Sequence, residues 1–544
     1  MIFTSILILI TAKALPSLNR NIPSIYFTRI SSLIFIYAGL LTINSLYMHE
    51  SIGSGIAIYS GLFQITPVSI LLESFLLIIG GLILVSWPIT IVKKYSPLSE
   101  KISEDYSLIV LFSSLGSSLL ISSFDLISLY ISIELQSFGL YVLATLYRDS
   151  ETSTKAGLKY FLLGGLSSCI ILLGCGLIYA YTGLTNFESL YSIISTSNVI
   201  FDINQGLNLG LILIFIGFLF KIAAAPLHNW SPDVYDEVPT IVTTWLTIIP
   251  KISILVVLLE LQYYGFTLIS TDITNNMVNI APSLTTNSSI IKLLLLVSSV
   301  LSLLIGTFVG LAQTRIKRLL AYSTISHIGF ILLALAINSE SSIDSLIFYI
   351  IQYTITNLNI FLIILALSYV AITSNYSLSI QKIDMQIRDI RYIRELSGKF
   401  LINPILTISL AICLFSMAGI PPLIGFFSKQ FVLYSAIQNG YYFISLIAIS
   451  VSVISASYYI KIVKVLYSGE NDYNIQPLSE EDSKTVLAQL DNSSNTTGTN
   501  QLLLLSNLHS YLISVLTLSI LFFILKPSLI LNSTQVLSLS LFNC

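Results

Sequence analysis

Four charged residues lie inside long apolar stretches of this 544-residue chain: Glu134, Lys221, Lys251 and Lys429. A charge at the centre of a bilayer costs on the order of 2.5–3.5 kcal/mol, so such residues usually face a polar interior and have a function. A carboxylate and several lysines in this setting could take up and release protons. Each residue could instead belong to a structural ion pair or to a solvated helix end.

His327 is a fifth candidate, in the segment Ser326-His327-Ile328-Gly329. Imidazole titrates near neutral pH, so this side chain could relay protons between two lysine sites. A core histidine with satisfied hydrogen bonds explains the residue equally well. Two weaker candidates, Glu73 and Asp125, could be helix-packing partners or entrance groups.

The composition excludes a soluble enzyme, a disordered protein and a nucleic-acid binder. Hydrophobic residues make up 55% of the chain, charged residues only 10%, and the mean hydropathy is +0.87. A soluble domain has about 25% charged residues. The net charge of −2 leaves no basic surface for phosphates. The four cysteines form neither a disulfide framework nor a C-x-x-C metal or redox site.

The apolar runs predict an all-α polytopic membrane protein with fourteen spanning helices, because each helix needs about 20 apolar residues. The expected spans are 1–12, 30–46, 66–92, 106–124, 126–147, 157–182, 207–227, 240–261, 290–312, 319–337, 343–372, 401–435, 441–464 and 501–531.

The positions of Lys and Arg support this count independently. Twenty of the 25 basic residues fall in every second connection, whereas the connections 183–206, 262–289 and 338–342 contain none. Basic connections remain on the side where the chain is synthesised. We therefore expect the basic connections on one side of the membrane and both termini on the other.

Prolines predict breaks in two of the spans, near Ala223–Pro226 and near Gly419–Pro422. Proline removes a backbone hydrogen bond from a helix. Freed backbone inside a membrane is tolerated only where protein or a water-filled cavity satisfies it. A broken helix that carries a lysine is therefore a plausible half-channel element, as in transporters.

Weak internal symmetry relates the two halves of the chain. Gly139 and Ala144 match Gly329 and Ala334 at an offset of 190, and Phe220, Ala223 and Pro226 match Phe415, Ala418 and Pro421 at an offset of 195. The matched helices are five apart, so the second copy must be inverted. We expect a three-helix segment at 1–105, inverted repeats of five helices at 106–264 and 265–468, a polar loop at 469–500, and a last helix within 501–544.

Three motifs then resemble those of the antiporter-like membrane subunits of respiratory complex I. They are PLHNWSPDVY at 226–235 followed by Pro239-Thr240, LLAYSTISHIG at 319–329, and AGIPPLIGFFSK at 418–429. With the helix count, the resemblance covers roughly residues 100–465. The composition, rich in Ile, Tyr and Asn, suggests a fungal or similar mitochondrial genome. One departure is Asp236-Glu237, where bacterial members tend to have glycine and alanine.

The resemblance implies that Glu134 and Lys221 pair, that Lys251 is a central relay, and that Lys429 is the exit-side site. It also implies that the basic side is the mitochondrial matrix and that the termini face the intermembrane space. The expected partners are other complex I membrane-arm subunits, including a neighbouring antiporter-like subunit and accessory subunits, together with lipids, water and protons. No nucleic acid is expected.

The leading interpretation is therefore a proton-translocating subunit that performs no redox chemistry itself. No P-loop, dinucleotide fingerprint, haem ligand pair or cysteine cluster is present in the sequence. NADH, FMN, iron–sulfur clusters and ubiquinone are expected in partner subunits, and no cofactor or metal in this chain. Two alternatives stay open: an Mrp-type cation/proton antiporter, and a structural membrane spacer whose charges are vestigial.

Overall fold

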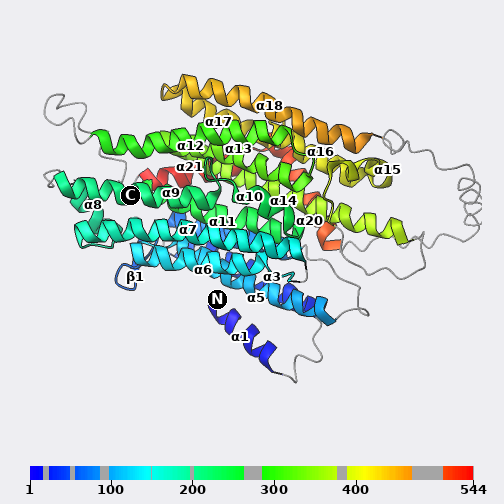
Figure 1. Ribbon diagram of the computed structural model, residues 1–544, viewed down its shortest axis with the longest axis horizontal. Helices are drawn as coiled ribbons and strands as arrows, with labels where there is room; N and C mark the ends of the chain where they lie inside the picture. The colour runs from blue at the N-terminus through cyan, green and yellow to red at the C-terminus, as the bar shows by residue number, and fades with distance from the viewer. Residues whose placement is uncertain are drawn as a thin grey trace, which may run out of the picture.

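The computed structural model describes residues 1–15, 24–48, 55–85, 97–148, 150–195, 201–262, 285–376, 389–468 and 507–542. The long helices run side by side in one elongated bundle (Figure 1). Within the described ranges, ten helices are long and apolar enough to cross a membrane, and shorter apolar helices accompany them. The all-α polytopic fold is confirmed. The predicted polar loop at 469–500 lies outside the described residues.

The observed helices follow the predicted spans. The N-terminal segment contains α1 (Ile2–Ala14), α3 (Ser24–Met48) and α4 (Pro67–Val85). The first repeat contains α5 (Pro97–Ile121), α6 (Leu126–Ala144), α7 (Glu151–Thr182), α9 (Phe201–Ile222), α10 (Trp230–Glu237) and α11 (Thr240–Leu261). The second repeat contains α12 (Thr285–Leu311), α13 (Ile316–Ile337), α14 (Glu340–Tyr376), α16 (Pro404–Ala418), α17 (Ile424–Gln438) and α18 (Tyr442–Tyr467).

Several short elements have no counterpart among the predicted spans. They are the antiparallel hairpin of β1 (Ile56–Ile58) and β2 (Phe63–Ile65), the helices α8 (Phe187–Ser195) and α10, and the 3-10 turn η3 (Ile393–Leu396). The short helix α15 (Lys399–Ile402) overlaps only the start of the span predicted at 401–435. The hairpin is attached to the ends of α5 and α6, since Gln64 N donates to Ser122 O and Phe124 N donates to Leu62 O.

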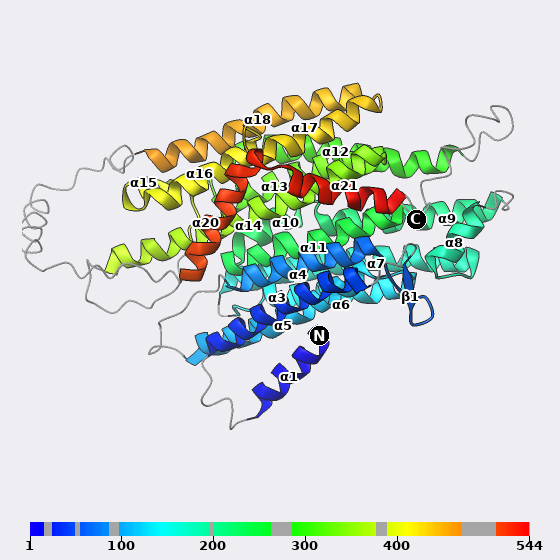
Figure 2. The same ribbon diagram turned by 180° about the vertical axis from the view of Figure 1, so that it is seen from behind.

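The single last helix predicted at 501–531 is wrong in its extent. The structure has α20 (Asn507–Leu521), the 3-10 turn η5 (Phe522–Leu525) and a separate helix α21 (Ser528–Phe542). Pro527 lies between them, and its ring removes a backbone donor and ends the helix. Figure 2 shows the change of direction from α20 to α21. Both helices pack on α14 and also contact α4.

The two repeats share the same close packing at glycine. A Cβ added to Gly116 would lie 2.5 Å from the backbone nitrogen of Gln136, and one added to Gly306 would lie 2.7 Å from that of Ser326. Gly116 and Gly306 are 190 residues apart in the sequence, and so are Gln136 and Ser326, which is the predicted offset. Only glycine allows the backbones of α5 and α6, and of α12 and α13, to approach this closely. The sequence symmetry therefore reflects a repeated helix pair.

A second repeated feature is a short backbone bridge that precedes α6 and α13. Leu126 N donates to Thr185 O at 3.0 Å, and Ile316 N donates to Arg391 O at 3.0 Å. The first bridge leads into α8 and the second lies beside α15, which sit at opposite ends of the bundle (Figure 1). The repeats are therefore inverted relative to each other, as predicted.

The helices α11, α13 and α14 form the centre of the bundle. The apolar stretches of α11 and α13 are wholly buried, and α14 is buried over most of its length. A helix that is apolar all round requires neighbours on every side. Side chains on these three helices therefore face protein rather than lipid, which is the setting that buried polar groups need.

Candidate proton-relay site

Glu134 and Lys221 approach each other between α6 and the end of α9. The Lys221 Nζ lies 3.8 Å from the Glu134 Oε1, and their side chains are 8% and 17% exposed. Neither atom has a hydrogen-bond partner among the residues that the structure describes. The distance satisfies the predicted ion pair, but it is about 1 Å longer than a charge-assisted hydrogen bond.

A small cavity adjoins Lys221. Its lining includes Ser137, Tyr141, Phe220, Lys221 and Pro250, the residue before Lys251. The space open to the centre of a water molecule is about 20 Å³. One water needs roughly 10–15 Å³ by this measure. The cavity therefore has room for about one water that could bond Lys221, on the side facing α11.

The predicted breaks occur where the prolines placed them. α9 ends at Ile222, and Ala223 follows with a left-handed φ of 65°. α16 ends at Ala418, and Gly419 follows with a φ of 88°. The carbonyl of Phe220 accepts from Ala223 N at 3.0 Å and from the indole Nε1 of Trp230 at 2.9 Å, so α10 is bonded to the last turn of α9. The prediction of two unwound helices is confirmed.

Lys251 is buried in α11, directly after Pro250. Its ammonium donates to Thr324 Oγ1 at 3.1 Å and to Tyr353 Oη at 3.4 Å. The same nitrogen lies 5.5 Å from the centre of the Tyr235 ring. No carboxylate lies within 4 Å of it among the described residues. Hydroxyls and aromatic faces therefore replace a carboxylate around this ammonium.

His327 is bonded on both ring nitrogens. Nδ1 lies 2.7 Å from Tyr349 Oη, and Nε2 lies 3.2 Å from Tyr459 Oη. A neutral imidazole donates from one nitrogen and accepts at the other, so the two tyrosines complete its hydrogen bonding. The same chain of hydroxyl, imidazole and hydroxyl can pass a proton along. Both interpretations of His327, core histidine and relay, fit this arrangement.

Lys429 caps the broken helix that precedes it. Its Nζ donates to Met417 O and to Ala418 O, both at 2.9 Å. These are carbonyls at the end of α16 that have no partner within the helix. The end of a helix carries roughly half a negative charge, which favours a nearby cation. The ammonium also lies 5.8 Å from the centre of the Phe330 ring.

One face of α13 connects the three sites of the second half. Thr324 bonds Lys251, His327 follows three residues later, and Phe330 lies beside Lys429 after another three. Three residues rise about 4.5 Å along an α-helix. His327 therefore lies midway, along α13, between the contacts of the two lysines.

Sequence reasoning missed the aromatic and hydroxyl partners of these lysines. Tyr235, Thr324 and Tyr353 contact Lys251, and Tyr349 and Tyr459 contact His327. One signal was available, because Tyr349, Tyr353 and Asn357 recur every four residues and so share one face of α14.

Asp125 was predicted to be either a helix-packing partner or an entrance group, and its hydrogen bonds fit the packing role. It accepts hydrogen bonds from Ile127 N and from Thr185 Oγ1, both at 2.8 Å, and so caps α6. Within the ranges that the structure describes, no three His, Cys, Asp or Glu residues come together in a way that could hold a metal ion.

Comparison with known proteins identifies the family of the chain. Residues 123–455 match the family described as NADH:quinone oxidoreductase/Mrp antiporter, TM. The chain is 47% identical to NADH-ubiquinone oxidoreductase chain 2 of Rhizopus oryzae over the whole of both chains. It is 36% identical to chain 2 of Marchantia polymorpha, over 79% of this chain and 80% of the relative.

Two solved structures share the fold. A chain of respiratory complex I from Thermus thermophilus matches with a TM-score of 0.68 at 24% identity, covering 98% of this chain and 99% of that one. A chain of the Mrp complex from Dietzia sp. matches with a TM-score of 0.70 at 18% identity, covering 98% and 95%. From the full-length sequence match, the chain belongs to the NADH-ubiquinone oxidoreductase chain 2 family, within the NADH:quinone oxidoreductase/Mrp antiporter membrane proteins.

Proposed function

We propose that Glu134, Lys221, Lys251, His327 and Lys429 carry protons in that order through this chain. The chain is a membrane-arm subunit of respiratory complex I, the proton-translocating NADH:ubiquinone oxidoreductase of the mitochondrial inner membrane. The observation that carries the relay is the pairing of Glu134 with Lys221 across 3.8 Å without a hydrogen bond. Such a contact can be made or broken by a small displacement of α6 or α9.

The mechanism follows from the charges. When Glu134 moves away or is neutralised, the buried Lys221 ammonium loses its only carboxylate among the described residues and releases its proton. The water-sized cavity reaches from Lys221 to Pro250, which supports transfer towards Lys251. From there the Thr324, His327 and Phe330 face of α13 leads to Lys429.

Release of a proton on the far side of the membrane also has to overcome the membrane potential. Moving one charge across 100 mV takes about 2.3 kcal/mol. Pairing and unpairing of a buried charge changes its free energy by about 3–5 kcal/mol, which is sufficient. The switch at Glu134 and Lys221 therefore has the right magnitude to drive one step.

The chemistry that powers the relay belongs to other chains in this proposal. NADH, FMN, iron–sulfur clusters and ubiquinone would bind partner subunits, and this chain would hold no cofactor. Its neighbours in the membrane arm would include another antiporter-like subunit and accessory subunits. The basic connections would face the matrix and both termini the intermembrane space, in line with the distribution of Lys and Arg.

Replacement of Lys221 by Met tests the relay in the assembled complex. In sealed inner-membrane vesicles, we expect fewer protons moved per NADH oxidised while the complex still assembles. A normal ratio at normal assembly would favour the structural-spacer alternative. The Mrp-type alternative predicts cation/proton exchange without NADH oxidation, so exchange by the isolated chain would support it instead.

A further inference from the structure

The start of α13 contacts α10 and the turn that follows α10 through three basic side chains. Arg315 Nη1 lies 2.6 Å from Asp236 Oδ2, and Arg318 Nη2 lies 3.0 Å from Asp233 Oδ1. Lys317 Nζ donates to Val238 O at 2.9 Å. Asp233 also pairs with Lys159 of α7. We call the pairs of Asp236 with Arg315 and Asp233 with Arg318 the α10–α13 clamp.

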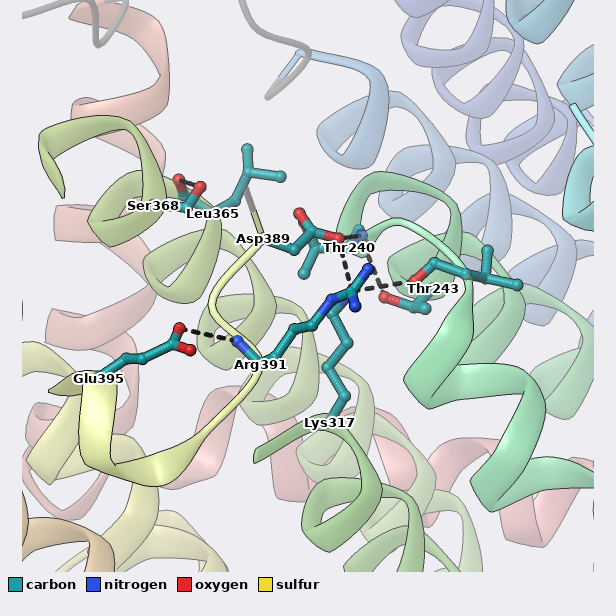
Figure 3. Close-up of polar contacts among 9 residues, drawn as sticks. Thr240, Thr243, Lys317, Leu365, Ser368, Asp389, Arg391 and Glu395 are labelled. Carbon is teal, nitrogen blue, oxygen red and sulfur yellow. Dashed lines mark hydrogen bonds and ion pairs between the residues drawn. The ribbon is translucent and has the colours of Figure 1, made fainter. Parts of the chain in front are cut away.

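Asp389, which precedes η3 in the chain, makes a fourth contact with the segment between α10 and α11. Asp389 accepts hydrogen bonds from Thr240 N at 3.0 Å and Thr240 Oγ1 at 2.9 Å, and it lies 2.6 Å from Lys317 Nζ (Figure 3). Burial raises the pKa of Asp389, but Lys317 and the bonds from Thr240 outweigh it and hold the pKa below its usual range. The carboxylate therefore stays charged and caps the first turn of α11.

The charges at the start of α13 are unfavourable for that helix alone. Arg315, Lys317 and Arg318 lie in its first turn, where the helix dipole favours acids over cations. Arg315 and Arg318 are 43% and 38% exposed, as cations that orient a chain in a membrane can be. Asp236, the partner of Arg315, is however only 4% exposed, and Lys317 is 2% exposed. The acids on α10 offset this cost, so the arrangement ties two helices together.

The two helices joined by the clamp both touch the Lys251 ammonium. Tyr235 of α10 presents its ring at 5.5 Å, and Thr324 of α13 accepts a hydrogen bond at 3.1 Å. Asp236 is the residue after Tyr235. A change in the separation of α10 and α13 therefore changes at least one of these two contacts of Lys251.

We propose that Asp233 and Asp236 are positioning residues for Lys251, which fix the separation of α10 from α13 through Arg318 and Arg315. The inference rests on the proposed function, because it assigns these acids to the central step of the relay. It also gives a role to Asp236, at which this sequence departs from the pattern of the resembling subunits.

The test measures protons moved per NADH oxidised in sealed inner-membrane vesicles that contain the assembled complex. We expect Asp236→Asn and Arg315→Met each to lower this ratio, because each removes one ion pair of the α10–α13 clamp. The double variant Asp236→Arg with Arg315→Asp should recover more than half of the loss. Glu151→Gln is the matched control, because it breaks an exposed ion pair with Lys155 on α7, and it should keep the wild-type ratio.

A wild-type ratio for Asp236→Asn, or a swap no better than the single variants, overturns the proposal. If Asp236→Asn does not assemble, Arg318→Met decides, because it removes a more exposed member of the clamp. A lowered ratio there supports the proposal and a wild-type ratio overturns it. Lys221→Met is measured alongside. A wild-type ratio for Lys221→Met refutes the relay itself, whereas a low ratio there with a wild-type ratio for Asp236→Asn refutes only the positioning role.

Discussion

The Lys221 ammonium and the Glu134 carboxylate lie 3.8 Å apart, and neither facing atom makes a hydrogen bond to a described residue. Two buried opposite charges at this distance attract each other strongly, yet the final contact is missing. A structural ion pair would gain by closing to about 2.8 Å. The open gap supports the proposal that this pair separates during a cycle.

Glu134→Asp should retain more proton movement than Glu134→Gln. The aspartate keeps the negative charge, and a water can bridge the added gap of about one methylene, whereas glutamine removes the charge that stabilises the Lys221 ammonium. Proton movement per NADH oxidised and the amount of assembled complex would be measured for both variants. Equal ratios for the two variants at wild-type assembly would contradict the switch, and poor assembly with normal activity per complex would indicate a purely structural pair.

Gly116→Ala should prevent the complex from assembling. Its Cβ would meet backbone atoms of Leu135 and Gln136 within 3.0 Å, and backbone cannot move aside as a flexible side chain can. Gly165→Ala is the control, because a Cβ there has nothing within 4 Å. It should assemble normally, since alanine favours a helix over glycine by about 1 kcal/mol. Native gels would compare the two, and equal assembly would refute the close packing of α5 on α6.

Gly419→Ala should disturb the Lys429 site. Gly419 has a φ of 88°, and an added Cβ would lie 3.1 Å from the Lys429 Cδ. The left-handed conformation costs a residue with a Cβ about 1–2 kcal/mol. Ala223→Gly, at the equivalent break with a φ of 65°, should have the opposite effect on stability. Thermal unfolding of the purified complex would show a lower midpoint for the first variant, and an unchanged midpoint would argue against strain at Gly419.

Glu237→Gln should stabilise the complex at neutral and alkaline pH. Burial raises the pKa of Glu237, the neighbouring Asp233 and Asp236 raise it further, and Lys159 and Arg315 only partly oppose them. The folded protein thus holds this proton more tightly than the unfolded chain. Wild-type stability therefore falls as pH rises from the unfolded value of about 4.3 through the higher folded value. The glutamine removes that loss.

Thermal midpoints of the Glu237→Gln and wild-type complexes, measured in steps between about pH 5 and 8, would check this sign. The difference should shrink as the pH is lowered towards the unfolded pKa. A difference that grows at acid pH would show that the carboxylate is stabilised rather than destabilised by its surroundings.

The buried charged residues, the two helix breaks and the order of the spanning helices could be predicted from the sequence, because each depends on residues close together in the chain. Pro226 and Pro422 lack a donor, and Gly139 and Gly329 repeat a packing requirement, so these features are visible along the chain. The partners of Lys251 are not visible, because Thr324 and Tyr353 lie far away in sequence and reach it only through the packing of α11 against α13 and α14. The separate α21 was missed although Pro527 marks the boundary, since the apolar run continues across it.

The Lys429 ammonium donates its hydrogen bonds to neutral carbonyls, and this affects how the proposed relay would release a proton. Its ammonium is held by Met417 O and Ala418 O, just as Lys251 is held by hydroxyls, so Glu134 is the only acid among the five relay residues. A line of three ammonium groups with one counter-charge repels itself. In the proposed relay, a proton that arrived at Lys221 would raise the free energy of the protonated forms of Lys251 and Lys429, and the proton at Lys429 would leave. Crowding of like charges, rather than a gradient of ever stronger binding, would eject the last proton.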